Sequence, residues 1–463
     1  MTRETTRLKT LWYMGAKTRL CEEFLDGAVR DLLSPGGTLL DACCGTAAVA
    51  RWFAPGYRIL ANDSQQFSAV IARAHLEGDG EWTQELDRLE PQQDLGLAIS
   101  ENQRLLDGLV PKALELEDSI LSQVIDAVTG PDECPEVLNR YRAFVSEAPL
   151  PDGSAADKHI PSLHQPLAMR MPELLEQRMQ DPSKAPALMC TAYWAHVYFG
   201  IRQATRIDSI RHAIDQIPMA DPHRCRKQTL YLAALLHAVS VSTSGTSHFA
   251  QPRSIARDSE LVAVAKRRMI DIDVQFDLAL DAIRTEWLES PRLDGNKVYC
   301  SDIHGLLEAG SPLDEEDVDL VYLDPPYTAD NYSRFYHVLE TLVEYDYPQL
   351  LTRGGELTRG RYPGQEKRFT SDFCSSIKAE DAFRSVARSC KERGASLLIS
   401  YSTDTGLLTR KWRNLGDENP ASRFRNMLLE YYGSVEIREK TLMHSGQGDS
   451  NRSVRELLLL CEG

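Results

Sequence analysis

The tetrapeptide Asp324-Pro325-Pro326-Tyr327 directly follows a short apolar run, Val321 to Leu323. Each proline fixes its own φ and biases the preceding residue toward extended backbone, so a stiff loop is predicted at a strand end. A planar exocyclic amine held there would donate its two hydrogens to the Asp324 carboxylate and the Pro325 carbonyl, while Tyr327 stacks on the ring. Both donations aim the nitrogen lone pair outward, toward an electrophilic methyl group. The alternative interpretation is a Pro-Pro turn that only closes a buried strand.

A second group of residues has the pattern strand, turn, helix, strand. The mostly apolar run from Thr38 to Ala42 predicts a strand, Gly45 a sharp turn, and Thr46 to Phe53 a short helix. The N-terminus of that helix would offer unpaired amides to a carboxylate. Asp63 lies twenty-two residues after Asp41, at the predicted tip of the second strand, where an acidic side chain accepts ribose hydroxyls. This pattern alone fits any nucleotide-binding Rossmann domain.

Together with the tetrapeptide, several segments in the right order resemble the Dam-like, class-alpha N6-adenine-specific DNA methyltransferases, which use S-adenosylmethionine. Trp12 to Lys17 is similar to the family's opening Tyr-x-Gly-Gly-Lys segment, with Ala16 in place of the second glycine. Leu39 to Thr46 occupies the place of the cofactor-binding loop, Ile59 to Asp63 that of the acidic strand end, and Val298 to Asp302 precedes the tetrapeptide. The resemblance covers residues 11 to about 76 and 296 to about 345.

The resemblance implies roles for particular residues. Tyr13 and Lys17 would contact the cofactor carboxylate or close over the cofactor, and Asp302 would accept the amino group of its adenine. Lys17 as a solvated lysine at a helix start, and Asp302 as a cap of a helix from Ile303 to Ala309, are the alternatives. The full set of cofactor-binding candidates is Tyr13, Gly15, Lys17, Asp41, Cys43, Gly45, Asp63, Ser301, Asp302 and Asp324. No metal site is expected.

Length and composition indicate a cytoplasmic enzyme of two or more lobes. The chain has 463 residues, of which 42% are hydrophobic, enough for a sizeable core. Charged residues precede the first short apolar stretch, so no signal peptide is expected. The run from Leu230 to Val241 is interrupted by His237 and is shorter than a membrane span needs. Ten cysteines without a Cys-x-x-Cys pair are typical of reduced thiols in the cytosol.

The formal net charge of -16 is unexpected for a protein that binds DNA, but it is unevenly distributed. Gly80 to Arg140 has fourteen acidic and four basic residues, whereas Gly200 to Arg268 has eleven basic and five acidic residues. A local patch decides where phosphates dock, so the second stretch leaves a site-directed DNA contact open. The acidic total argues against nonspecific coating of nucleic acid.

The predicted fold class is α/β, a Rossmann-like methyltransferase sheet with a large, mainly helical insertion. Residues 1–79 and 290–463 are assigned to the catalytic domain, and residues 80–289 to the insertion, a target-recognition region. Within the insertion, the Pro-, Asp- and Ser-rich stretch 131–186 is predicted to be a loop. The aromatic residues between Tyr193 and Phe199 are assigned to core packing rather than to base stacking. Residues 435–461 are predicted to form two antiparallel strands.

Residues for DNA contact are predicted in two places. The hydroxyl-rich segment 242–253 ends in polar residues, of which His248, Gln251 and Arg253 would bind a strand or read base edges. After the tetrapeptide, Tyr332 and Arg334 would clamp the target phosphate or fill the gap in the duplex left by a flipped base. The glycine- and arginine-rich stretch 353–364 is predicted to be a flexible loop along a DNA backbone. An ordinary polar loop capping a core helix is the alternative for segment 242–253.

We therefore predict a site-specific DNA methyltransferase that transfers a methyl group from S-adenosylmethionine to adenine N6 of a flipped-out base in double-stranded DNA. Asp324, Pro325, Pro326 and Tyr327 are the catalytic candidates. Alternatives are a cytosine-N4 enzyme, in which the tetrapeptide usually begins with Ser, an RNA or protein-amide methyltransferase, and an inactive DNA-binding regulator. No nuclease motif is present, so a restriction or defence partner would be a separate chain.

Overall fold

The computed structural model describes residues 17, 20–129, 135–147, 164–181, 186–246, 248–445 and 451–463. The described chain divides into two compact units. One, the sheet unit, comprises residues 17–87, 283–333 and 369–463; the other, the helical unit, comprises residues 88–282 and 334–368. Three helices, α5 (Gly80–Arg88), α14 (Ile272–Glu289) and α16 (Tyr332–Phe335), include residues of both units.

The sheet unit is built on one seven-stranded sheet of order β3-β2-β1-β4-β7-β9-β8. The first five strands in this order pair in parallel, whereas β9 pairs antiparallel with both β7 and β8. The strand bounds are β1 Thr38–Asp41, β2 Arg58–Asp63, β3 Lys297–Cys300, β4 Leu320–Leu323, β7 Ser396–Ser402, β8 Ser434–Ser445 and β9 Asn451–Glu462. The predicted α/β class and the antiparallel pair at the C-terminal end are confirmed.

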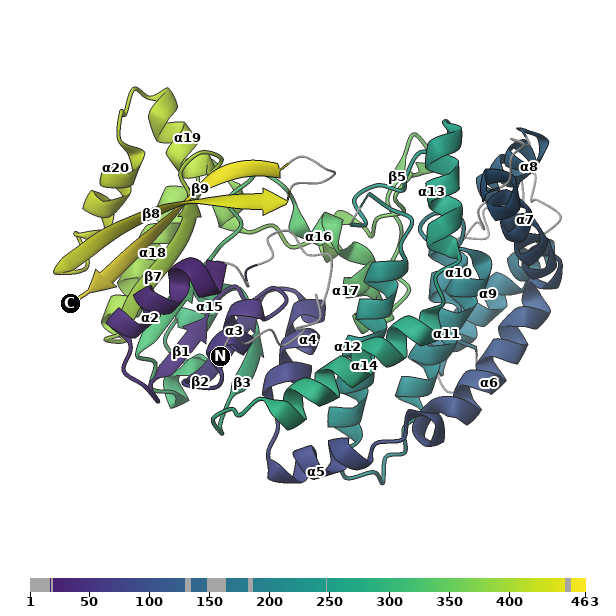
Figure 1. Cartoon of the computed structure of the whole chain (residues 1–463), viewed down its shortest axis with the longest axis horizontal. Helices are drawn as coiled ribbons and strands as arrows, with labels where there is room; N and C mark the ends of the chain where they lie inside the picture. Colours follow the sequence, from purple (N-terminus) through teal and green to yellow (C-terminus); the bar gives the residue numbers. More distant parts are fainter. Residues whose placement is uncertain are drawn as a thin grey trace. The chain divides into compact units, whose positions relative to one another are not determined.

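The sheet has a hydrophobic core on each face, because successive side chains of a strand point to opposite sides. Leu40, Val321 and Ile399 pack with helices α15, α18 and α20 in one core. Their neighbours Leu39, Tyr322 and Leu398 belong to the other core, with η1, α2 and α3. In Figure 1, these helices lie on the two faces of the strands.

Helices connect the strands of the sheet unit. Those not shared with the helical unit are η1 Cys21–Leu25, α2 Asp26–Leu32, α3 Ala48–Phe53, α4 Gln66–Leu76, α15 Ile303–Leu307, η3 Pro312–Glu315, η5 Asp372–Cys374, α18 Ala379–Glu392, α19 Leu407–Asn414 and α20 Pro420–Leu428. Helix α3 follows β1 closely, as the strand, turn, helix pattern predicted. The end of α14 is held to this unit by Glu286, which pairs with Arg51 of α3 and with His75 of α4.

The helical unit consists of packed helices and one small hairpin. Its elements are α6 Pro91–Leu109, α7 Pro111–Thr129, α8 Pro135–Ser146, α9 Gln165–Gln180, α10 Met189–Trp194, α11 Ile201–Asp215, α12 Arg224–Ser242, α13 Asp258–Arg268, α17 His337–Glu344, β5 Thr352–Arg353, β6 Glu356–Leu357 and η4 Gln365–Lys367. Tyr193, Trp194, Tyr198 and Phe199 are buried, so their assignment to core packing is confirmed. None of the helices in the described part of the chain is long and apolar enough to cross a membrane.

The prediction of a loop over residues 131–186 is wrong for its described parts, where α8 and α9 form. Helix α8 buries Tyr141, Phe144 and Val145, and α9 buries Leu167, Met171 and Leu174. Apolar residues three or four positions apart face one side of a helix, and this periodicity was masked by the surrounding Pro, Asp and Ser.

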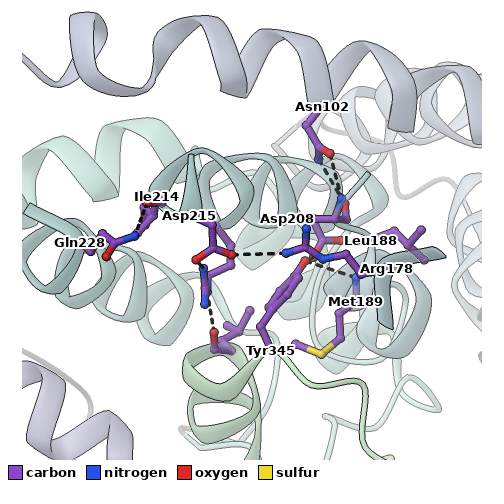
Figure 2. Close-up of polar contacts among 12 residues, drawn as sticks. Asn102, Arg178, Leu188, Met189, Asp208, Ile214, Asp215, Gln228 and Tyr345 are labelled. Atoms are coloured by element: carbon purple, nitrogen blue, oxygen red, sulfur yellow. Dashed lines mark hydrogen bonds and ion pairs between the residues drawn. The ribbon is translucent and has the colours of Figure 1, made fainter. Parts of the chain in front are cut away.

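Residues 334–368, which follow the tetrapeptide, pack with the helical unit rather than with the sheet on which the sequence placed them. The buried Asp208 of α11 explains part of this difference. Its carboxylate accepts a hydrogen bond of 2.5 Å from the Tyr345 hydroxyl (Figure 2). It also accepts hydrogen bonds from the backbone N–H groups of Cys190 and Thr191. Burial raises the pKa of Asp208 to about 6, opposed by these donors.

A pair of arginines strengthens the same attachment. Arg178 and Arg211 lie over the Tyr345 ring, with guanidinium carbons 5.4 and 5.0 Å from its centroid. Arg178 also pairs with Asp215 (Figure 2). Arg211 pairs with the same carboxylate, and its Nε donates to the carbonyl of Leu342 at 2.8 Å. The segment after the tetrapeptide is therefore fixed to α9 and α11 by buried, charge-assisted contacts.

Candidate functional site

Four acidic candidates lie at or just after the C-terminal ends of adjacent parallel strands. Asp41 ends β1, Asp63 ends β2, Asp302 follows β3, and Asp324 follows β4. The chain order reverses between β1 and β4, which are neighbours in the sheet. In open α/β sheets ligands bind outside the carboxyl ends of the strands at such a reversal. The fold therefore places these residues along the edge where a ligand site is expected.

The buried Asn62 connects three of these strand ends, and the sequence analysis gave it no role. Its side-chain nitrogen donates to the carbonyls of Ala42 (3.1 Å) and Ser301 (3.0 Å), and its oxygen accepts the Ser301 amide (3.1 Å). An amide is suited to this position because it supplies both donors and an acceptor. Asn62 thus fixes the relative positions of the residues after β1, β2 and β3.

Asp324 forms an ion pair with Lys17, one of the residues predicted to contact the cofactor. Lys17 Nζ lies 2.5 Å from Asp324 Oδ2, and the two side chains are 18% and 13% exposed. Burial lowers the pKa of Lys17, but Asp324 and the buried Glu456 of β9 raise it by more, so Lys17 stays protonated. Lys17 is therefore a partner of the tetrapeptide and not a solvated lysine.

The other oxygen of Asp324 is an unused acceptor. Oδ1 is buried and has no hydrogen-bond donor among the described residues. The hydroxyl of Ser400 on β7 lowers the pKa of Asp324 but has no hydrogen bond of good geometry to it. Burial is the largest effect and raises the pKa of Asp324, while Lys17 opposes the shift. A buried carboxylate oxygen without a donor is costly, and it fits a ligand that brings an N–H group.

Asp41 lies next to Asp324 at the ends of neighbouring strands. Its Oδ2 accepts the backbone N–H of Ala50 in the first turn of α3 at 3.2 Å. Burial raises the pKa of Asp41 to about 8, and the negative charge of Asp324 adds to the shift. At neutral pH Asp41 is therefore mainly protonated, which avoids a second buried charge beside Asp324.

Asp63 holds the turn after β1. Its Oδ2 accepts the Gly45 amide and its Oδ1 the Gln65 amide, each at 2.9 Å. Gly45 has φ of +52°, a left-handed conformation that glycine adopts without strain. Burial raises the pKa of Asp63 to about 6, opposed by these amides. Each carboxylate oxygen keeps a second lone pair, so the predicted acceptance of ribose hydroxyls stays a prediction.

The other cofactor candidates differ in exposure. Cys43 is half-buried, and burial and the nearby acidic groups raise the pKa of its thiol well above the ordinary value, so it is no thiolate nucleophile. Asp302 is exposed and occupies the N-cap position of α15, but its side chain makes no capping hydrogen bond. The carboxylate is thus not used as a helix cap. Tyr13 and Gly15 lie outside the described residues.

The ring of Tyr327 is held at the edge of the core. It meets the Tyr401 ring edge to face, with centroids 6.1 Å apart, and the Tyr327 carbonyl accepts the Leu407 amide at 2.9 Å. The residue is half-buried, and burial raises the pKa of its hydroxyl. Tyr327 therefore has a fixed backbone and a partly open side chain.

The residues predicted to contact DNA are divided between the two units. Tyr332 belongs to the sheet unit, whereas Arg334, His248, Gln251 and Arg253 belong to the helical unit. Gln251 is exposed and Arg253 half-buried. The prediction that His248 reads bases is not supported by its position, because the ring is buried 4.5 Å from the Phe335 ring and its Nδ1 accepts the Ala250 amide. His248 instead stabilises the turn of its own loop through the Ala250 amide.

Several basic residues of the stretch 200–268 form ion pairs within the helical unit. Arg202 pairs with Asp118, Arg206 with Asp273, and Lys227 with Asp94 and Asp221. Arg268 donates to a backbone carbonyl instead. Part of the positive charge of this stretch is therefore matched by acidic side chains of the same unit.

Comparison with known proteins gives the class to which this site corresponds. Residues 287–356 match the family model of the D12 class N6 adenine-specific DNA methyltransferases. This segment contains β3, β4 and the tetrapeptide. The match confirms the resemblance predicted from the motifs.

Two characterised relatives extend the comparison beyond this segment. The chain is 21% identical over 395 residues to the modification methylase LlaI of Lactococcus lactis subsp. lactis. The aligned part covers 85% of this chain and 46% of that protein. The chain is 27% identical over 213 residues to the type II methyltransferase M.FokI of Planomicrobium okeanokoites. This alignment covers 46% of this chain and 28% of that protein. The matched part is thus less than half the length of each relative.

Proposed function

We propose that the protein is a site-specific DNA methyltransferase that methylates adenine N6 in double-stranded DNA, with S-adenosylmethionine as methyl donor. The family match around the tetrapeptide and the two modification-methylase relatives support this activity. The parallel strands and the order reversal at β1 and β4 support a Rossmann-like sheet of the methyltransferase type.

The observation that carries the proposal is the unused Oδ1 of Asp324. It is a buried acceptor on a carboxylate whose other oxygen is held by Lys17. The amino group of adenine has two hydrogens, of which one would bond to Oδ1 and the other to the Pro325 carbonyl. Both bonds orient the nitrogen lone pair away from the two protein acceptors and toward the methyl donor.

Lys17 and Tyr327 would support this arrangement without taking part in bond formation. Lys17 favours the ionised form of Asp324 in a buried position, where burial alone favours the neutral acid. The Tyr327 ring would stack on the target base, which must leave the duplex because its amino group is otherwise inaccessible. After transfer the proton leaves to solvent or transiently to Asp324.

The edge formed by β1, β2 and β3 fits S-adenosylmethionine. The cofactor supplies an electrophilic methyl group on a sulfonium. The exposed Asp302, whose carboxylate caps no helix, would accept the amino group of the cofactor adenine. Asp63 and the Gly45 turn, positioned by Asn62 and the backbone amides, would hold the ribose and the methionine end.

A methyl-transfer assay with purified protein tests the proposal. Tritium-labelled S-adenosylmethionine is incubated with unmodified DNA, RNA or a peptide mixture, and the labelled acceptor is digested to its monomers. The expected result is label in DNA only, recovered as N6-methyladenine. Label in cytosine, RNA or peptide, or none in any acceptor, would refute the proposed activity. A separate restriction or defence partner stays a prediction.

A further inference from the structure

Two segments far apart in the sequence meet on the helical unit. One is the loop that contains Phe249 and Ala250, and the other is the segment 334–368. The Phe249 amide donates to the Phe335 carbonyl at 2.8 Å, and the Tyr362 hydroxyl donates to the Ala250 carbonyl. The Phe249 carbonyl in turn contacts Nε2 of His337 at 3.1 Å. Backbone groups of the loop are thus fixed by the segment that follows the tetrapeptide.

The segment 334–368 also contains the small exposed hairpin of β5 and β6. Strands β5 and β6 are joined through Gly354 and Gly355, with φ of +60° and +82° and open space where a side chain would stand. The Leu351 amide donates to the Tyr362 carbonyl at 2.7 Å, which ties the base of the hairpin to Tyr362. The predicted flexible loop is therefore an anchored hairpin, and its tip exposes backbone amides that a ligand could approach closely.

Arginines surround Tyr362 at this junction. Burial raises the pKa of the Tyr362 hydroxyl, and the positive charges of Arg334, Arg353 and Arg368 oppose that shift. The Arg334 guanidinium lies 5.5 Å from the centre of the Phe335 ring. We name these four residues, Arg334, Arg353, Tyr362 and Arg368, the arginine face.

Two members of the arginine face have donors that the described protein does not use. Arg353 is exposed and forms no ion pair with any described residue, and Arg368 Nε is buried without a hydrogen-bond acceptor in the described chain. Arg253, at the end of the neighbouring loop, likewise has a buried Nε without an acceptor among the described residues. The two buried Nε donors are costly unless an anion or water completes them, whereas the exposed Arg353 is free of any such cost.

Two neighbouring basic residues have acceptors within the protein. Arg361 is buried and donates to the carbonyls of Ala192 and Tyr193, and Lys367 pairs with Asp346 and Glu344. Residues 351–368 have five basic and two acidic side chains, a balance of +3 in a chain of net charge -16. Of these arginines, Arg353 and Arg368 have no carboxylate partner among the described residues.

We propose that the arginine face, with Arg253 beside it, binds backbone phosphates of duplex DNA. The inference rests on the proposed function and adds to it a named contact surface, part of which comes from the segment after the tetrapeptide. Guanidinium groups match phosphate geometry with two parallel hydrogen bonds, and the glycines of the hairpin permit close approach of a backbone. Phosphate contacts orient the protein on DNA without reading sequence.

The test is the salt dependence of DNA binding, which counts phosphate contacts. The full-length protein and the double variant Arg353→Ala/Arg368→Ala are titrated against a fluorescein-labelled 30-base-pair duplex of random sequence at several salt concentrations, with anisotropy as readout. Each lost phosphate contact lowers the slope of log K against log salt by about 0.9. The expected result is a slope smaller by about 1 to 2, with weaker binding at low salt.

Two further variants distinguish the loss of positive charge at the arginine face from a general effect of mutation on the helical unit. Arg353→Lys/Arg368→Lys keeps the charges and is expected to retain most of the slope. Arg104→Ala removes an exposed arginine of α6 in the same unit and is expected to leave the slope unchanged. An unchanged slope in the double alanine variant, or an equal loss in Arg104→Ala, would overturn the inference. Failure of the proposed function would instead be visible as absent methyl transfer by the unaltered protein.

Discussion

Lys17 Nζ contacts one oxygen of Asp324 at 2.5 Å, while the other oxygen has no donor in the described chain. The same carboxylate thus has two different environments, one that fixes its charge and one that is available to a ligand. Asp41, at the end of the neighbouring strand, is held neutral by burial and by that charge. Lys17 therefore lowers the pKa of Asp324, whereas burial and the charge of Asp324 raise the pKa of Asp41.

Replacing Lys17 should change the pH dependence of methyl transfer. In Lys17→Met, Asp324 loses the cation that opposes burial, and its pKa rises further. The acidic limb of the kcat/KM profile, measured with saturating cofactor, is expected to move to higher pH by about one unit or more. Lys17→Arg preserves the charge and should keep the limb near its original position. Identical profiles for Lys17→Met and the unaltered protein would show that Lys17 does not control Asp324.

Asp41 should make the sheet unit less stable at alkaline pH. Its folded-state pKa is about 8, above the ordinary value of 3.8. Its contribution to stability is therefore fully present below the ordinary value and is lost as pH rises through about 8. Asp41→Asn removes this ionisation, so its melting temperature should fall less between pH 6 and pH 9 than that of the unaltered protein. The exposed Asp381→Asn serves as control, and parallel pH dependences of all three proteins would contradict the assignment.

Stacking by Tyr327 predicts a difference between an aromatic and an aliphatic replacement. Tyr327→Phe keeps the ring and should retain most of the methyl-transfer rate. Tyr327→Ala removes a stacking interaction of about 1 to 3 kcal/mol, so kcat/KM should fall by roughly 5- to 150-fold. Steady-state rates on DNA, with cofactor affinity measured in parallel, provide the comparison. Equal losses in both variants would assign the effect to the hydroxyl instead.

The hydrogen bond from Tyr345 to Asp208 should stabilise the helical unit. Tyr345→Phe leaves a buried carboxylate without one of its donors, at a cost of about 1 to 3 kcal/mol. Tyr141→Phe is the matched control, because the buried Tyr141 hydroxyl has no hydrogen-bond partner in the described chain. Denaturant unfolding should show a lower midpoint for the first variant and an unchanged or higher one for the second. The reverse order would contradict the proposed attachment.

The sequence predicted the strand ends well because local patterns determine them. An apolar run followed by Asp324-Pro325 predicts the end of a strand, and β4 ends at Leu323. The spacing of Asp41, Gly45 and Asp63 predicted the first strand, turn, helix and second strand. The ion pair between Asp324 and Lys17 was not predictable, because the two residues are distant in the sequence.

The division of the chain and the role of His248 depend on long-range contacts that no local pattern encodes. Tyr345 follows the tetrapeptide closely, yet its partner Asp208 lies 137 residues earlier. Polar composition predicted that His248 faces DNA, whereas its contact with Phe335 buries it. Local chemistry therefore gave the candidate residues, and tertiary packing decided which of them are available.

The most direct test of the central claim is single-turnover methyl transfer by Asp324→Ala, compared with cofactor binding by the same variant. If Asp324 Oδ1 holds the target amino group, the transfer rate should fall by at least about 100-fold, as when one oriented hydrogen-bonding group is removed from a reaction site. The Kd for S-adenosylmethionine should stay within a few fold, because other strand ends hold the cofactor. An unaltered rate of DNA methylation by Asp324→Ala would contradict the account.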